Sequence, residues 1–131
     1  MKGLDTNVLV RYIMQDDPRQ SAKAARLIES LSSDQPGFVS LVSIVELYWV
    51  LTSCYQLTNH QVHQALDVLL RTKQIVVDRA DQVLRALRVF GDGKADFADC
   101  LIERTGAAAG CDETMTFDTS AAKHGGMTLI A

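Results

Sequence analysis

Short apolar segments bounded by turn residues alternate along this chain with longer segments of helical periodicity. Strands of about three to five residues that alternate with helices of about ten or more are typical of βαβ units, in which helices cover a parallel sheet. We therefore predict an α/β fold, a three-layer sandwich with a short, mostly parallel sheet of four to five strands and helices on both faces. We expect strands at 2–4, 37–39, 74–77, 113–117 and 127–130, and helices from residue 18 onward, at 41–54, after 59, at 80–90 and at 94–110.

Local signals set several of these boundaries. Asp17 can cap a helix whose first residue is Pro18, because proline lacks the N–H that a first helical residue leaves unbonded. The segment 41–51 is apolar nearly all round, so a strand is an alternative, but its length favours a buried helix capped by Ser40. Asn59 can cap the next helix. The helix after Asp17 has an expected apolar face of Ala22, Ala25, Ile28 and Leu31.

The length of 131 residues and the hydrophobic content of 47% fit one globular domain over residues 1–131. The sequence has no run of about 18 apolar residues. Lys2 is soon followed by Asp5, which is unlike a secretory leader. We therefore expect a cytoplasmic protein with no membrane partner. The three cysteines are an odd number without CxxC spacing, which favours buried, reduced thiols over a disulfide frame or a zinc site.

Several classes of chemistry have no motif in this sequence. It contains no GxxxxGK[ST] phosphate loop, no GxGxxG dinucleotide motif and no nucleophile elbow with Ser-His-Asp partners. His60 and His63 lie three residues apart on a predicted helix, but no third ligand accompanies them, and solvent-facing polar residues are the favoured interpretation. Carboxylates remain the main candidates for chemistry.

Glu46 is the most unusual of these carboxylates. It is the only charged residue between Asp34 and Asp67, and it lies in the most apolar predicted helix. Burying a lone carboxylate is costly unless it is paired or bound to metal, so Glu46 needs a partner or a raised pKa. The alternative is an exposed strip of that helix, with Ser43 beside Glu46.

Further acids occur at positions where a ligand could bind. Asp96, Asp99 and Glu103 lie three and four residues apart, so they share one face of a predicted helix. An ordinary acidic surface strip is the alternative interpretation. Asp5 and Asp118 each follow a predicted strand, and open parallel sheets bind ligands beyond the carboxyl ends of their strands.

Four segments together resemble the motifs of the PIN-domain family, in the same order and with similar spacing. Each short string occurs by chance, but four in order within one βαβ chain are specific. The resemblance covers essentially the whole chain, whose length matches that of single-domain VapC-type toxins. Two departures, Glu103-Arg104 after the third motif and a last strand close to the chain end, touch no expected ligand. The four segments are Asp5-Thr6-Asn7, Ile44-Val45-Glu46-Leu47, residues 96–102 and Thr116-Phe117-Asp118.

The resemblance implies an endoribonuclease that depends on Mg²⁺ or Mn²⁺, forms a homodimer and is inhibited by a small antitoxin protein. Its metal would be held by Asp5, Glu46, Asp99 and Asp118. Because Mg²⁺ takes only one or two carboxylates directly and keeps several waters, we expect Asp5 and Asp99 as direct ligands and Glu46 and Asp118 as direct or water-mediated ones. Asp96 would be an accessory.

Neighbouring residues have supporting roles in this interpretation. Hydroxyl and amide groups beside the acids can orient the carboxylates, although each can equally serve as a local cap or turn residue. Basic residues near the motifs would hold the RNA backbone. The first group comprises Thr6, Asn7 and Thr116, and the second comprises Arg11, Lys94 and Lys123.

The net charge of −3 at first argues against a nucleic-acid partner, because affinity for phosphate comes mostly from Lys and Arg. If five acids surround cations, however, 16 acidic side chains less those five leave 11, against 13 basic ones. The remaining surface is then mildly basic. The five acids are Asp5, Glu46, Asp96, Asp99 and Asp118.

Two other functional classes stay open on the sequence. An Mg²⁺-dependent aspartyl-phosphate protein, either a phosphatase or a receiver domain, also places acids at strand ends. The phosphatase would need an acid where Asn7 stands. The receiver could use Asp78 as its phospho-accepting residue, but it would also need a Lys near the last strand, and residues 127–131 contain none. A catalytically inactive PIN-like module that binds RNA or protein would lack one of the four carboxylates, and none is missing.

Overall fold

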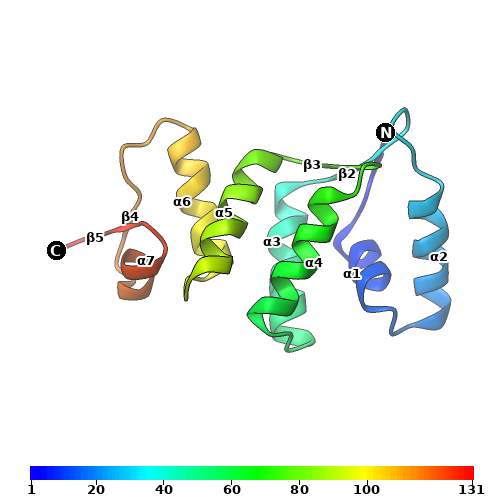
Figure 1. The fold of residues 1–131 in the computed structure, drawn as a ribbon, viewed down its shortest axis with the longest axis horizontal. Helices are drawn as coiled ribbons and strands as arrows, with labels where there is room; N and C mark the ends of the chain where they lie inside the picture. Colours follow the sequence, from blue (N-terminus) through cyan, green and yellow to red (C-terminus); the bar gives the residue numbers. More distant parts are fainter. The chain divides into compact units, whose positions relative to one another are not determined.

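The computed structural model describes residues 1–131 as helices joined by short strands, in two compact units, Met1–Asp78 and Arg79–Ala131 (Figure 1). The first unit contains β1 (Lys2–Gly3), α1 (Thr6–Met14), α2 (Pro18–Glu29), β2 (Gly37–Val39), α3 (Leu41–Trp49), the π-helix η1 (Val50–Cys54), α4 (Asn59–Arg71) and β3 (Ile75–Val77). The second contains α5 (Ala80–Asp92), α6 (Phe97–Ala108), β4 (Met115–Thr116), α7 (Thr119–His124) and β5 (Thr128–Leu129). A single domain over 1–131 stays a prediction.

The strands of the first unit form a parallel sheet in the order β1-β2-β3. Lys2 pairs with Gly37, and Val39 pairs with Val77. A larger residue at position 37 would require the side chains of Leu4 and Leu31 to shift, because a Cβ there would lie 2.8 Å from both. The close approach allows β2 to lie against the core between its neighbours.

Capping side chains start the helices of this unit. Asp17 accepts hydrogen bonds from the backbone N–H of Arg19 and Gln20, and Pro18 is the first helical residue, as predicted. The predicted cap at Asn59 was wrong by one residue: Thr58 caps α4 in a reciprocal arrangement with Gln61. Such a capping box satisfies two backbone donors at once, which favours Thr58 over its neighbour.

Helix packing builds the core of the first unit. Helix α1 lies against α2 and α3, and α4 contacts β3 and η1. The predicted apolar face after Asp17 is right at Ile28 and Leu31, which are buried, but wrong in its first turns, where Ser21 and Ala24 are buried instead of Ala22 and Ala25. The fully buried side chains of this unit are mostly aliphatic: Leu9, Ile28, Val39, Ile44, Leu47, Leu51, Val62 and Leu66.

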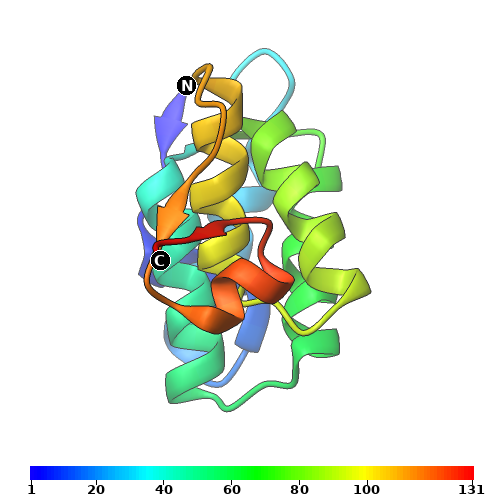
Figure 2. The ribbon, with the colours of Figure 1, turned by 90° about the vertical axis from the view of Figure 1, so that its left-hand side faces the viewer.

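In the second unit, α5 packs along α6, and the rings of Phe90 and Phe97 meet edge to face at 5.8 Å. The parallel strands β4 and β5 are joined through α7, which contacts both; these elements are orange to red in Figure 2. Helix α6 begins at Phe97, later than predicted, because Asp96 caps it.

The α/β class with parallel strands is confirmed. The five strands are those predicted, but they form a three-stranded and a two-stranded sheet. Two helices, α1 and α7, were not predicted. The cysteines are free, yet only Cys100 is buried, since Cys54 ends η1 and Cys111 follows α6 at the surface. None of the helices has the length and apolar character needed to cross a membrane.

Candidate active site

Asp5 lies between β1 and α1 and caps the helix. Its side chain accepts a hydrogen bond from the backbone N–H of Thr6 at 2.8 Å, and its backbone carbonyl accepts from Val8. Negative charge is stabilised at a helix N-terminus by the helix dipole. The residue is exposed, and its second carboxylate oxygen has no hydrogen-bond partner in the protein. One oxygen is therefore left to bind a ligand.

Glu46 is linked to Asp5 through Thr6. The Thr6 hydroxyl donates a hydrogen bond to Oε1 of Glu46 at 2.9 Å, and Thr6 itself is only 7% exposed. Glu46 is exposed on α3, and the partner that the sequence required is Thr6. Ser43, expected beside it on an exposed strip, is buried and belongs to the cap made by Ser40. Thr6 thus joins the first and second motifs.

A second group of acids surrounds the start of α6. The side chain of Asp96 caps α6 by accepting from the backbone N–H of Asp99 at 3.0 Å. Asp99 is partly buried, and its pKa is raised, first by burial and then by the nearby charges of Asp96 and Asp118. No Lys or Arg forms an ion pair with Asp99. Negative charge is therefore concentrated around Asp99 at the start of α6.

Asp118 follows β4 and caps α7. Its side chain accepts from the backbone N–H groups of Ser120 and Ala121, at 2.8 and 3.2 Å. Thr116 accepts from the backbone N–H of Asp118 at 3.0 Å, so its hydroxyl contacts the backbone of the turn rather than the carboxylate. Asp118 therefore has the same local arrangement as Asp5, a strand end followed by a helix cap.

The structure brings the predicted ligands together in two groups, one in each unit. Asp5 and Glu46 are joined by Thr6, and Asp99 interacts with Asp96 and Asp118. Neither unit by itself holds three or more His, Cys, Asp or Glu side chains placed to bind a metal ion. Convergence of the two groups on one cation stays a prediction.

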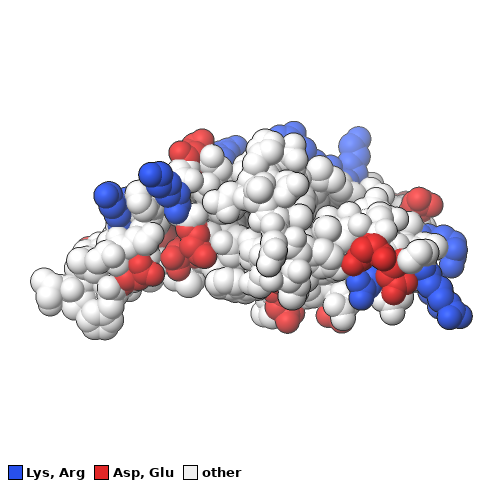
Figure 3. Space-filling model, turned by 90° about the horizontal axis from the view of Figure 1, so that it is seen from below, with Lys and Arg blue, Asp and Glu red and all other residues white.

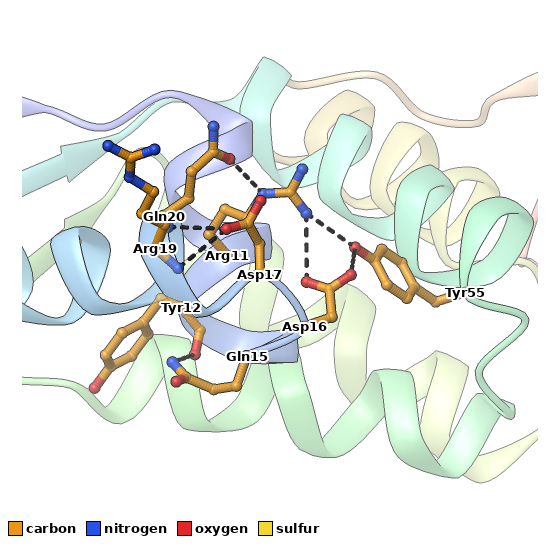
Figure 4. Close-up of polar contacts among 8 residues, drawn as sticks. All are labelled: Arg11, Tyr12, Gln15, Asp16, Asp17, Arg19, Gln20 and Tyr55. Carbon is orange, nitrogen blue, oxygen red and sulfur yellow. Dashed lines mark hydrogen bonds and ion pairs between the residues drawn. The ribbon is translucent and has the colours of Figure 1, made fainter.

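Arg11, one of the predicted RNA-binding residues, takes part in a polar network that the sequence did not reveal (Figure 4). Its Nε donates to Gln20 at 2.7 Å, and its Nη1 lies 3.3 Å from Asp16 and 3.4 Å from the Tyr55 hydroxyl. Tyr55 in turn donates to Asp16 at 2.7 Å, and this hydrogen bond is the main reason that the pKa of Asp16 is lowered. Lys94 and Lys123 are exposed.

The two residues after the third motif pair with each other. Glu103, whose side chain is 15% exposed, forms an ion pair with Arg104, and the hydrogen bond raises the pKa of Arg104. Cys100, one turn earlier, has a pKa raised to about 11 by burial and by the neighbouring acids. Its thiol is therefore protonated at neutral pH and is no candidate nucleophile.

Comparison with known proteins agrees with this arrangement of motifs. The family model of the PIN domain matches residues 3–126, a stretch that contains all four candidate ligands. The chain belongs to the PIN domain family. This PIN domain is also 22% identical over 129 residues to a VapC ribonuclease of Aquifex aeolicus (strain VF5). The match covers 98% of this chain and 96% of that protein, so the similarity extends from end to end.

Proposed function

We propose that this PIN domain is an endoribonuclease dependent on Mg²⁺ or Mn²⁺, the toxin of a toxin–antitoxin pair, which cuts structured RNA with metal-activated water. Family membership and the similarity to a VapC ribonuclease support a nuclease of this kind. The observation that carries the metal dependence is Asp99, a partly buried carboxylate that lies beside the charges of Asp96 and Asp118 and itself forms no ion pair with Lys or Arg. Such a group is stabilised by a bound cation.

The available donors fit a hard divalent cation. All the candidate ligands are carboxylates, and Mg²⁺ prefers oxygen ligands while retaining several waters. Asp5 and Asp99 are proposed as direct ligands, with Glu46 and Asp118 binding directly or through water. Asp96 is proposed as an accessory to these four. The caps at Asp5 and Asp118 use one oxygen each and leave the other available.

The chain's own residues prepare this chemistry. Thr6 fixes one oxygen of Glu46, and Asn7 lies next to it on the first turn of α1. Thr116 holds the turn that presents Asp118. When bound, the metal would lower the pKa of a coordinated water and stabilise charge on the scissile phosphate. The carboxylates would keep that water in place and accept no covalent intermediate.

The same proposal includes the partners of the family. RNA would be held near the carboxylates by basic residues such as Lys94 and Lys123, and the protein would act as a cytoplasmic homodimer. A small antitoxin would present a basic side chain to the acidic groups when metal is absent, because charge-assisted hydrogen bonds to carboxylates are strong.

Asparagine substitutions test the proposal without removing the caps. Asn caps helices about as well as Asp, so Asp5→Asn should fold normally. Asp99→Asn should fold as well, because the cap of α6 is made by Asp96 and uses only the backbone N–H of Asp99. We expect the wild-type protein to cleave structured RNA in Mg²⁺ or Mn²⁺ and to stop in EDTA, and we expect both variants to be inactive. Asp112→Asn, in an exposed turn outside both groups of acids, is the matched control and should retain full activity.

Three outcomes would contradict the proposal. Cleavage that continues unchanged in excess chelator would remove the metal mechanism. Release of phosphate from small phosphoesters without RNA cutting would indicate an aspartyl-phosphate phosphatase. RNA binding by the wild type without cleavage under any metal would indicate an inactive PIN-like module.

A further inference from the structure

A pocket lies between α1 and α2, beside the candidate ligand Asp5. It has a volume of about 310 Å³ and is lined from α1 by Asn7, Val8 and Arg11, and from α2 by residues that include Gln20, Ala24 and Leu27. Asn7 is two residues from Asp5, so the pocket adjoins the N-terminal end of α1.

The lining of the pocket combines apolar walls with two carboxamides. Val8, Ala24 and Leu27 supply the apolar surface. The Gln20 carbonyl oxygen accepts from Arg11, which leaves the Gln20 amide group available to donate, and Asn7 is exposed with both a donor and an acceptor. A nucleobase, flat and apolar on its faces with hydrogen-bonding groups at its edge, fits such a lining.

One edge of the pocket is basic. Arg19, Lys23 and Arg26 lie four and three residues apart on α2, so they share one face of the helix, and all three are exposed. Lys23 also lines the pocket. None of these side chains forms an ion pair within the protein, and Figure 4 shows the guanidinium of Arg19 without a contact. Arg11, by contrast, is already compensated by Asp16.

Basic side chains project at the α2 edge of the first unit, although acidic atoms lie near them (Figure 3). The only acid within α2 is Glu29, which lies at the end of the helix. Three adjacent cations beside a pocket that suits a nucleobase match a nucleic acid, whose phosphates repeat along the strand. The carboxamides of Asn7 and Gln20 add hydrogen-bonding groups that match the edge of a base, which favours RNA over an acidic protein segment as the occupant.

We propose that the groove between α1 and α2 binds RNA, with an unpaired base in the pocket and the flanking phosphates on Arg19, Lys23 and Arg26. The proposal rests on the proposed nuclease function and adds to it a substrate feature, an unpaired nucleotide close to the cleavage site. Recognition of unpaired bases in loops is the usual way in which proteins read RNA sequence. Arg11 shapes the pocket by holding Gln20.

Binding in EDTA tests this groove without cleavage of the probe. The probes are a labelled RNA hairpin with an unpaired loop and a blunt RNA duplex with the same number of nucleotides, titrated with full-length protein across about 50 to 200 mM salt. The test variant is R19Q/K23Q/R26Q. The matched control, K73Q/R85Q/R88Q, removes the same charge from exposed positions outside the groove.

We expect the wild type to bind the hairpin more tightly than the duplex. Each lost contact to a single-stranded phosphate should lower the slope of log K against log salt by about 0.7, so the test variant should lose about 2. The control should keep the wild-type slope. Gln20→Ala should keep the slope but reduce the preference for the hairpin severalfold.

Several results would overturn the proposal. The slope of log K against log salt could fall equally in the control variant, or it could stay unchanged in the test variant. Gln20→Ala could keep the full preference for the hairpin, or the wild type could bind neither RNA. The nuclease function is tested separately. If the salt slopes are as expected but the wild type does not cleave RNA in Mg²⁺, the nuclease function is wrong and the RNA-binding groove stands. If the wild type cleaves RNA but the test variant keeps the wild-type slope, the nuclease function stands and the groove does not bind RNA.

Discussion

Asp5, Asp96 and Asp118 each accept hydrogen bonds from the first backbone amides of a helix. A capping carboxylate has a fixed orientation, because a hydrogen bond ties one of its oxygens to the backbone. Metal ligands need such fixed orientation to bind with the correct geometry. The caps and the proposed ligand roles are therefore compatible, and the sequence alone could not separate them, since Asp serves equally well in either role.

The raised pKa of Asp99 predicts a stability effect at the residue scale. An acid whose pKa is higher in the folded than in the unfolded state destabilises the fold once it is ionised. Asp99→Asn should therefore raise the midpoint of thermal unfolding at pH 7 in EDTA, and this gain should shrink as the pH falls toward 3.8, the ordinary pKa of the group. Mg²⁺ should stabilise the wild type more than the variant. A lower midpoint at pH 7 would make Asp99 a structural residue.

Ser21 offers a second test at this scale. Its hydroxyl is buried in α2, 2% exposed, and has no hydrogen-bond partner. Leaving a buried hydroxyl unsatisfied costs about 1 kcal/mol or more, so Ser21→Ala should raise the free energy of unfolding by about 1 kcal/mol in urea titrations. Ala22→Ser, at the exposed neighbouring position, measures the difference in helix propensity alone and should lower the free energy of unfolding by about 0.5 kcal/mol. A loss of stability in Ser21→Ala would show that the hydroxyl has a partner in solution.

At the scale of elements, the long helices could be predicted from their apolar residues and their length, and the short strands from their alternation with those helices. Helix α1 was missed because its β-branched residues favour strands and weaken the helical signal, and because its cap, Asp5, was interpreted as a ligand. Helix α7 has six residues, too few for periodicity to show. The π-helix η1 continues α3 through the predicted range, and nothing in the sequence distinguishes it from an α-helix.

The link between α1 and α3 predicts a measurable effect on metal use. Thr6→Val removes the hydroxyl that binds Glu46 while keeping the shape of a buried side chain. Because groups that orient ligands typically contribute about 10- to 100-fold to metal affinity, the Mg²⁺ concentration for half-maximal cleavage should rise at least about tenfold. The KM for RNA should change little, and Thr6→Ser should restore the wild-type value. A change in KM alone would assign Thr6 to RNA binding.

At the scale of the whole molecule, the alternation of strands and helices predicted the α/β class, and the order of four short motifs predicted the family. The division of the five strands into two sheets could not be predicted, because strands of only two or three residues carry little information about which strands they pair with. The pairing of Thr6 with Glu46 was equally hidden, since 40 positions separate them. The contact depends on the packing of α1 on α3 rather than on any local pattern.

The proposed function requires that the two groups of acids, one in each unit, hold the same cation. Titration with Mn²⁺, with the free ion measured by electron paramagnetic resonance, tests it in the wild type, Asp5→Asn, Asp99→Asn and the double variant. Because either substitution would damage one shared site, each should weaken Mn²⁺ binding at least about tenfold. The loss of binding free energy in the double variant should then be well below the sum of the losses in the two single variants. Retention of a wild-type Mn²⁺ site in either single variant, with all binding lost only in the double variant, would contradict the account.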